Sequence, residues 1–145
     1  MAVERTANAV WEGDLMNGSG EVSTESGVLR NATVKWSSRA EQADENTSPE
    51  ELIAAAHAVC VSMALAHGLA QAGTPAQRLE SQATATFDQT DDGFRLTTMK
   101  LSIRGQVEGI DGVVFQEAAE AAKDNCPVSQ ALKDNVDVSV DVQLG

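Results

Sequence analysis

Apolar residues dominate one long stretch near the middle of the chain, over residues 52–65. Just before it, Ser48 is followed by Pro49, and Glu51 stands three residues after Ser48. This is the pattern of a helix N-cap, a proline in the first turn and a capping-box acid. Gly73 follows the apolar stretch and is typical of a helix end. We therefore predict a helix that begins after Ser48 and ends just before Gly73.

The middle of this predicted helix is apolar nearly all round, and a helix without a polar face is buried on several sides. We expect it to be the central helix of the domain or of a dimer. His57 and Ser62 interrupt the apolar run. The run is also shorter than the roughly 20 residues that a membrane span requires, so no membrane is expected as partner.

Alternating apolar and polar residues predict strands on both sides of this helix. The predicted strands cover residues 7–11, one or two segments of 28–36, residues 79–88 and 94–107, and the strictly alternating residues 136–142. The predicted turns fall at 12–14, 18–20 and 91–93, and residues 37–48 are predicted to form a loop.

Two more helices are predicted in the C-terminal third of the chain. Residues 111–124 form an amphipathic pattern, and a short helix should follow Pro127. The side chains expected to point inward from the first of them are Val114, Ala118, Ala121 and Ala122. The order strands, helix, strands, helices, strand indicates an α+β fold with antiparallel sheets packed on the long central helix. The length of 145 residues fits a single domain spanning 1–145.

Charge narrows the choice of partners. The chain has 22 acidic and 10 basic residues, with a net charge of −12. This argues against nucleic acid and anionic membrane surfaces, which attract positive proteins. We interpret the acid excess as a solubility feature; a salt-adapted proteome is the alternative.

The residues after Met1 contain no apolar core of a signal peptide, so a cytoplasmic protein is expected. In that reducing compartment a catalytic or transient pair is a better interpretation of two cysteines than a structural disulfide.

Cys126 is the first candidate for chemistry, because Pro127 suits the first turn of a helix and places Cys126 at or beside its N-cap. The amides and dipole at a helix start favour a thiolate. The alternative is a small buried side chain with no reactivity.

Cys60 lies in the middle of the long helix, where burial raises the pKa of a thiol unless a cation is near. A nucleophilic Cys60 would therefore need an arginine, and periodicity does not choose among them; otherwise Cys60 is core packing. The candidate arginines are Arg5, Arg30, Arg39, Arg78, Arg95 and Arg104.

His57 lies one helical turn before Cys60. His67 is ten residues further on and does not complete a helical ligand pair, so we expect no metal. A hydrogen-bonded core histidine is the better interpretation of His57. No phosphate-binding loop or other cofactor motif is present, and no cofactor is expected.

With these residues in view, the chain resembles the osmotically inducible protein C (OsmC) family and its relative, the organic hydroperoxide resistance (Ohr) family. Four segments carry the resemblance, and the histidine before the first cysteine favours the OsmC branch. The segments are Trp11-Glu12-Gly13-Asp14, residues 18–27, residues 48–65 and Asn125-Cys126-Pro127-Val128-Ser129.

The resemblance implies an intertwined α+β homodimer with two active sites at the subunit interface. It implies a thiol-dependent peroxidase that reduces organic hydroperoxides to alcohols. Cys60 matches the peroxidatic cysteine and Cys126 the resolving one. Arg39 matches the arginine that stabilises the thiolate, and Glu50 the glutamate that holds this arginine. The expected reductant is a dithiol, either lipoyl-type or thioredoxin-like.

Two positions depart from the family pattern. Ala40 stands where relatives carry an aromatic residue after the arginine, and Val61 stands where they carry Phe after the cysteine. Both changes are expected to shrink the apolar surface near the site. Apolar alkyl hydroperoxides are nevertheless the expected substrates, because Ile53, Val59 and Met63, together with Val61, surround Cys60 in the sequence.

Two other classes of function remain open. One is a thiol module that binds a small electrophile without turnover, and the other is a structural dimerisation domain. Peroxide turnover with a dithiol reductant separates the peroxidase from both. Disulfide formation after one equivalent of peroxide separates the peroxidase and the thiol module from the structural dimerisation domain.

Overall fold

The long helix forms where the apolar stretch predicts it. In the computed structural model, which describes residues 1–145, helix α2 spans Pro49–Gln71. The amide of Glu51 donates to Ser48 Oγ at 3.1 Å, so Ser48 caps the helix. Gly73 adopts a φ of +85°, which glycine reaches without strain and which ends the helix.

Along the chain, strands and helices precede and follow α2 in the order of an α+β fold, which confirms the predicted fold class. In chain order they are β1 (Ala7–Glu12), β2 (Ser19–Thr24), β3 (Ala32–Val34), α1 (Trp36–Ala40), α2, β4 (Arg78–Thr90), β5 (Gly93–Gln106), α3 (Gly112–Asn125), α4 (Pro127–Leu132) and β6 (Asp137–Leu144).

The chain divides into two compact units, Met1–Leu52 and Ile53–Gly145. We predicted that residues 1–145 form a single domain. The division into two compact units does not test this, so it stays a prediction. The first unit holds an antiparallel sheet in the order β1-β2-β3, followed by α1.

In this unit three local predictions were wrong. Ser19 and Gly20, predicted as a turn, already belong to β2. Only Ala32–Val34 of the predicted strand region is a strand. Trp36–Ala40 forms the short helix α1, although Trp36 was predicted to belong to a strand and the other four residues to a loop. The N-cap Lys35 makes no side-chain cap bond, so the sequence contains no signal for the start of this helix.

The second unit holds a mixed sheet in the order β4-β5-β6. The hairpin β4–β5 is antiparallel, as predicted, and turns at Asp91 and Asp92. Strand β6 instead runs parallel to β5, so this sheet is not wholly antiparallel. The reason is that α3 and α4 form a crossover between the two strands, which parallel neighbours require.

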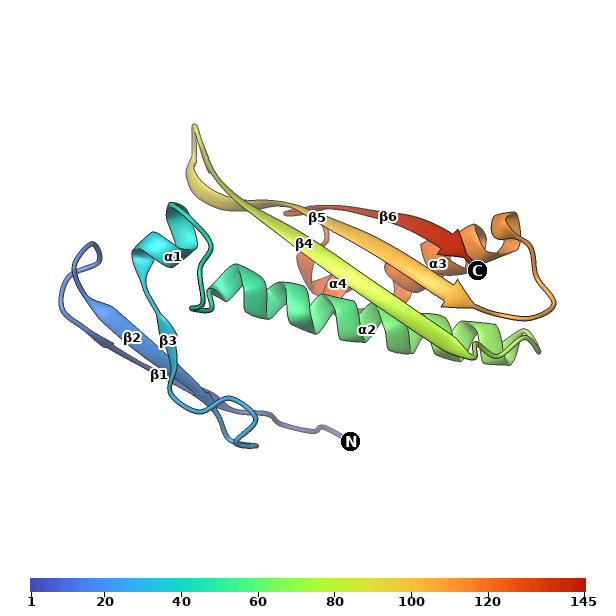
Figure 1. Ribbon diagram of the computed structural model, residues 1–145, viewed down its shortest axis with the longest axis horizontal. Helices are drawn as coiled ribbons and strands as arrows, with labels where there is room; N and C mark the ends of the chain where they lie inside the picture. Colours follow the sequence, from blue (N-terminus) through green and yellow to red (C-terminus); the bar gives the residue numbers. More distant parts are fainter. The chain divides into compact units, whose positions relative to one another are not determined.

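Helices α2 and α3 cover the same face of this sheet (Figure 1). Strict alternation on β5 turns its buried residues to that face. They meet fully or almost fully buried side chains of both helices in one core. The core residues are Val61, Leu65, Leu69, Met99, Leu101, Ile103, Val107, Phe115, Ala119, Ala122, Cys126 and Val140.

The inward face of α3 differs from the predicted one. Phe115 and Ala119 are fully buried, whereas Val114 is 44% exposed. Ala122 is buried as predicted, and Ala121 is exposed. The large ring of Phe115 sets the rotation of the helix, and an alanine-rich pattern alone does not reveal that rotation.

By length and hydropathy alone, Pro49–Gln71 is also suited to cross a membrane, and helices in protein cores share this property. Here one side of α2 packs into the sheet core through Val61, Leu65 and Leu69. The opposite side exposes Val59 and Met63. We expected α2 to be buried on several sides, but within a single chain only one side of it is buried.

Candidate active site

The two cysteines meet in the second unit, although 66 positions separate them in the chain. Cys60 lies on α2, and Cys126 lies at the junction of α3 and α4. Their Sγ atoms are 2.7 Å apart, and both thiols are free. Cys126 is fully buried, whereas Cys60 is partly exposed. A reagent from solvent therefore reaches Cys60 first.

The backbone fixes Cys126 at the start of α4, as the sequence predicts. Its amide donates to Ala122 O at 2.9 Å and closes α3, while its carbonyl accepts from the Gln130 amide at 3.0 Å. Pro127 occupies the first turn of α4. One residue thus serves as the C-cap of α3 and the N-cap of α4, which leaves its thiol little freedom.

The surroundings of Cys60 within this unit favour the thiol over the thiolate. Burial raises the pKa of Cys60, and the hydrogen bond with Cys126 raises it further. The backbone amide of Val128 lowers the pKa of Cys60, but by less. The expectation that a mid-helix thiol needs help to ionise is met. Nothing in the amino-acid sequence indicated that the Val128 amide belongs to the site.

An open apolar cavity of about 710 Å³ lies directly at Cys60. Val59 and Met63 form part of its wall, as expected. Val61 is fully buried in the sheet core, so it does not shape this cavity, and that part of the sequence prediction was wrong. Ile53 likewise packs against the core and does not line the cavity. The complete lining is Ala55, Ala56, Val59, Cys60, Met63, Ala64 and Pro127.

His57 is a buried, hydrogen-bonded histidine, as the sequence indicates. Its Nε2 lies 2.7 Å from Ser129 Oγ on α4, and its ring is fully buried. Burial lowers the pKa of His57, so the ring is neutral near pH 7. His, Cys, Asp and Glu side chains nowhere gather in a group of three that could hold a metal ion.

Arg39 and Glu50 form a two-pronged ion pair within the first unit. Arg39 Nε donates to Glu50 Oε1 and Nη2 to Oε2, each at 2.9 Å. The Glu50 side chain is only 11% exposed. Two parallel bonds of this kind fix the plane of the guanidinium as well as its position.

The segment between α1 and α2 is fixed by its own polar side chains. Ser38 Oγ donates to Asp44 Oδ2 at 2.8 Å, and Asn46 Nδ2 donates to Ser38 Oγ at 3.2 Å. The amide of Asn46 also donates to Asp44 Oδ1, which lowers the pKa of that carboxyl. These bonds hold the loop that leads from Arg39 to Glu50.

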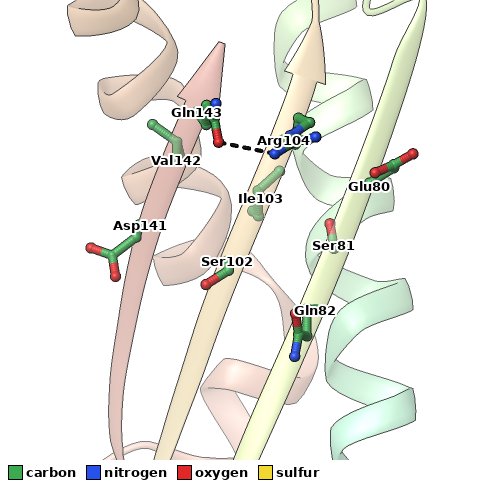
Figure 2. A pocket seen from close by; sticks show the side chains of 9 residues that line it. All are labelled: Glu80, Ser81, Gln82, Ser102, Ile103, Arg104, Asp141, Val142 and Gln143. Atoms are coloured by element: carbon green, nitrogen blue, oxygen red, sulfur yellow. Dashed lines mark hydrogen bonds between the residues drawn. The ribbon is translucent and has the colours of Figure 1, made fainter. Parts of the chain in front are cut away.

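The arginines of the second unit have other partners. Arg78 pairs with Glu80, Arg95 donates to the Phe94 carbonyl, and Arg104 donates to Gln143 Oε1. Figure 2 shows Arg104 and Gln143 beside a polar hollow of about 550 Å³ on the face of the sheet away from the helices. The hollow does not contain either cysteine.

The sequence of the chain matches one family of known proteins. The model of the family described as OsmC-like protein matches residues 42–141. The chain is 42% identical to Peroxiredoxin OsmC of Escherichia coli K12 over 144 residues, which is 99% of each chain. It therefore belongs to the OsmC-like family.

More distant relatives agree. The chain is 29% identical to the organic hydroperoxide resistance protein OhrB of Bacillus subtilis over 126 residues, 86% of this chain and 90% of that protein. The crystal structure of that OhrB superposes with a TM-score of 0.67 and covers 95% of this chain and 98% of its own. An OsmC structure from Legionella pneumophila superposes with a TM-score of 0.74 over 99% of both chains; at 23% identity it supports the fold alone.

Proposed function

We propose that this protein is a thiol-dependent peroxidase that reduces organic hydroperoxides to alcohols. One observation carries the proposal: a partly exposed thiol at an apolar cavity has a second, buried thiol 2.7 Å from it. The Cys60 thiol can react with an apolar substrate in the cavity, and the Cys126 thiol can then form a disulfide with the oxidised Cys60. The names of the relatives, Peroxiredoxin OsmC and OhrB, support the same reaction.

The chemistry needs three steps. The Cys60 thiolate attacks one peroxide oxygen, the O–O bond breaks, and the alkoxide leaves and takes up a proton to become the alcohol. Cys60 is now a sulfenic acid. The Cys126 thiol attacks its sulfur, so a disulfide forms and water leaves. A dithiol reductant then returns both cysteines to thiols and itself becomes a disulfide.

Arg39 and Glu50 are proposed to activate this site. A permanent guanidinium charge lowers the pKa of a neighbouring thiol and can donate to the leaving oxygen. Glu50 holds the guanidinium in one plane through the two bonds of 2.9 Å. Cys60 needs such a cation because burial raises its pKa. The arginines of its own unit have other partners.

We propose that the working form is a homodimer in which the Arg39–Glu50 pair of one subunit serves Cys60 of the other. On α2, Glu50 and Cys60 are separated by ten residues, which is about 15 Å along a helix axis. A side chain paired with Glu50 does not comfortably bridge that length to the thiol of the same helix. Val59 and Met63, which are 60% and 68% exposed, supply an apolar surface that a second copy would cover.

We also propose a reductant and a compartment that suit this chemistry. A lipoyl-type or thioredoxin-like dithiol suits a disulfide that must be reopened in each cycle. Two free cysteines that cycle between states fit the reducing cytoplasm, where we place the protein.

Steady-state consumption of peroxide tests the proposed function. Hydrogen peroxide, tert-butyl, cumene and fatty-acid hydroperoxides are compared, each with dihydrolipoamide or a thioredoxin system as reductant. We expect the organic hydroperoxides to be reduced with the higher kcat/KM, because the cavity at Cys60 is lined by apolar side chains. Equal or better efficiency with hydrogen peroxide would contradict the substrate class, and no turnover with any pair would contradict the activity.

A further inference from the structure

Two residues outside the reaction described above connect the same two helices as the cysteines. His57 stands three positions before Cys60 on α2, and Ser129 stands three positions after Cys126 on α4. The His57–Ser129 bond and the thiol pair therefore form two adjacent contacts between α2 and α4, at 2.7 Å each. The first is a fixed polar contact, and the second is the reacting pair.

Resting on the proposed peroxidase function, we propose that the His57–Ser129 hydrogen bond positions the start of α4, so that Cys126 resolves the Cys60 sulfenic acid quickly. His57 and Ser129 are positioning residues here, since neither touches the cavity at Cys60. The step that depends on them is disulfide formation, in which Cys126 sulfur bonds to Cys60 sulfur and water leaves.

Helix α4 needs such a contact because it is short. It has six residues, and its N-cap Cys126 makes no side-chain cap bond. Isolated helices of this length are not stable on their own. Only Val128 and Leu132 attach α4 to the core as partly buried apolar side chains. The buried hydrogen bond adds a directional contact to this apolar packing, beside the backbone amide of Val128 that faces Cys60.

Burial makes this hydrogen bond costly to lose. His57 is fully buried and Ser129 is 8% exposed. The bond to Ser129 is the one that the imidazole makes, since its Nδ1 has no partner. Breaking the bond would leave further polar groups unsatisfied in the interior. Because the ring is neutral, its contribution is a fixed position rather than a charge on Cys60.

Position matters because the thiols are close to bonding distance. They must move from 2.7 Å to about 2.05 Å, the length of a disulfide, around an added oxygen on Cys60. A misplacement of about 1 Å in a reacting pair costs on the order of a hundredfold in rate. Delayed resolution leaves the sulfenic acid exposed to a second peroxide, which converts it irreversibly to sulfinic acid.

The test follows Cys60 through a single turnover with cumene hydroperoxide and no reductant, by rapid quenching with a sulfenic-acid trap and mass spectrometry. We expect Ser129→Ala to form the sulfenic acid at nearly the wild-type rate and to resolve it about tenfold or more slowly. Excess peroxide should then give more sulfinic acid than in the wild type. Ser129→Thr keeps the hydroxyl and should restore rapid resolution.

Ser62→Ala is the matched control. Ser62 also donates a hydrogen bond from α2, but its partner is Ser81 Oγ on β4, at 2.6 Å, and not a residue of α4. Its loss should reduce the free energy of unfolding to a similar degree and leave resolution unchanged. His57→Phe is the second variant: it keeps a buried ring without nitrogen atoms and removes the partner of Ser129 Oγ, so it should also slow resolution.

The outcomes separate the two proposals. Resolution at the wild-type rate in both Ser129→Ala and His57→Phe would overturn the positioning role, while the peroxidase would stand. Equal slowing in Ser62→Ala would also overturn it, since any lost hydrogen bond would then suffice. Failure of the peroxide to oxidise Cys60 of the wild-type protein, either to the sulfenic acid or to the disulfide, would overturn both proposals.

Discussion

At the scale of single residues, exposure distinguishes two thiols whose different roles the sequence indicated only through resemblance to a family. Cys126 is fully buried, and Cys60 opens onto an apolar cavity. The sequence predicts that Cys126 lies at or beside a helix N-cap, but it does not report which of the two thiols faces solvent. The same holds for His57, whose partner Ser129 is 72 positions away and could be found only from the folded chain.

The first prediction at this scale concerns the effect of Arg39 on the reactivity of Cys60. Arg39→Ala should slow oxidation of Cys60 by on the order of a hundredfold, as removal of one preorganised donor at a reacting oxygen typically does. It should also shift the pH profile of Cys60 alkylation to higher pH, because the thiolate loses a cation. Stopped-flow oxidation and iodoacetamide titration measure the two effects.

Arg78→Ala is the control for this prediction, since Arg78 pairs with Glu80 and lines no part of the cavity at Cys60. Arg39→Lys should recover only part of the rate, because a lysine keeps the charge and loses the two-pronged bond to Glu50. An alkylation profile that is identical in Arg39→Ala and the wild type would assign the role to another group.

His57 gives a prediction on stability. Burial holds the pKa of His57 below its ordinary value of 6.5, so the folded state resists protonation that the unfolded state accepts. This contribution is complete above pH 6.5 and is lost as the pH falls through the lowered pKa of the folded state. Urea unfolding should therefore show a steeper loss of stability from pH 7 to pH 5 in the wild type than in His57→Phe. Parallel curves would contradict the prediction.

At the scale of elements, helices and strands with strong local sequence signals were predicted correctly, and those with weak signals were not. Helix α2 has a serine N-cap and a glycine stop, and its bounds were predicted within a residue or two. Helix α1 has only five residues and no side-chain cap, and it was missed. The direction of β6 was also missed, because the alternation that marks a strand is the same in parallel and antiparallel sheets.

Packing between β5 and α3 gives a prediction at this scale. A Cβ added at Gly105 would lie 2.4 Å from Cζ of Phe115, a fully buried ring that cannot move aside. Gly105→Ala should therefore lower the free energy of unfolding by roughly 1–3 kcal/mol, the usual cost of overpacking.

Gly68→Ala is the matched control. A Cβ at Gly68 meets no atom within 4 Å, and the residue lies within α2. The same substitution there should raise stability by about 0.5–1 kcal/mol, because alanine is the better helix former. Equal effects of the two substitutions in denaturant unfolding would show that the Phe115 contact does not limit the site.

At the scale of the whole molecule, the candidate residues fall into two groups. Arg39 and Glu50 form a pair in Met1–Leu52, whereas Cys60 and Cys126 meet in Ile53–Gly145. The residues were selected from the sequence by resemblance to a family; periodicity did not choose among the arginines. How the two groups combine depends on assembly, which a single sequence does not describe.

A mixed dimer tests this assembly. Cys60→Ser and Glu50→Ala subunits are co-expressed with two different tags, and the dimer that carries both is purified. If Arg39 and Glu50 act on the partner's Cys60, one of its two sites is intact, and about half of the wild-type activity should return. If they act on their own Cys60, neither site is complete. Activity no higher than half of that of the Glu50→Ala dimer would then be found.

The order of the two thiols is tested by one equivalent of cumene hydroperoxide followed by intact-mass and peptide analysis. The wild type should lose two hydrogen atoms and contain a Cys60–Cys126 disulfide. Cys126→Ser should instead gain one oxygen atom as a sulfenic acid at Cys60, and Cys60→Ser should not react. Oxidation of Cys126 in the Cys60→Ser protein at the wild-type rate would contradict the mechanism.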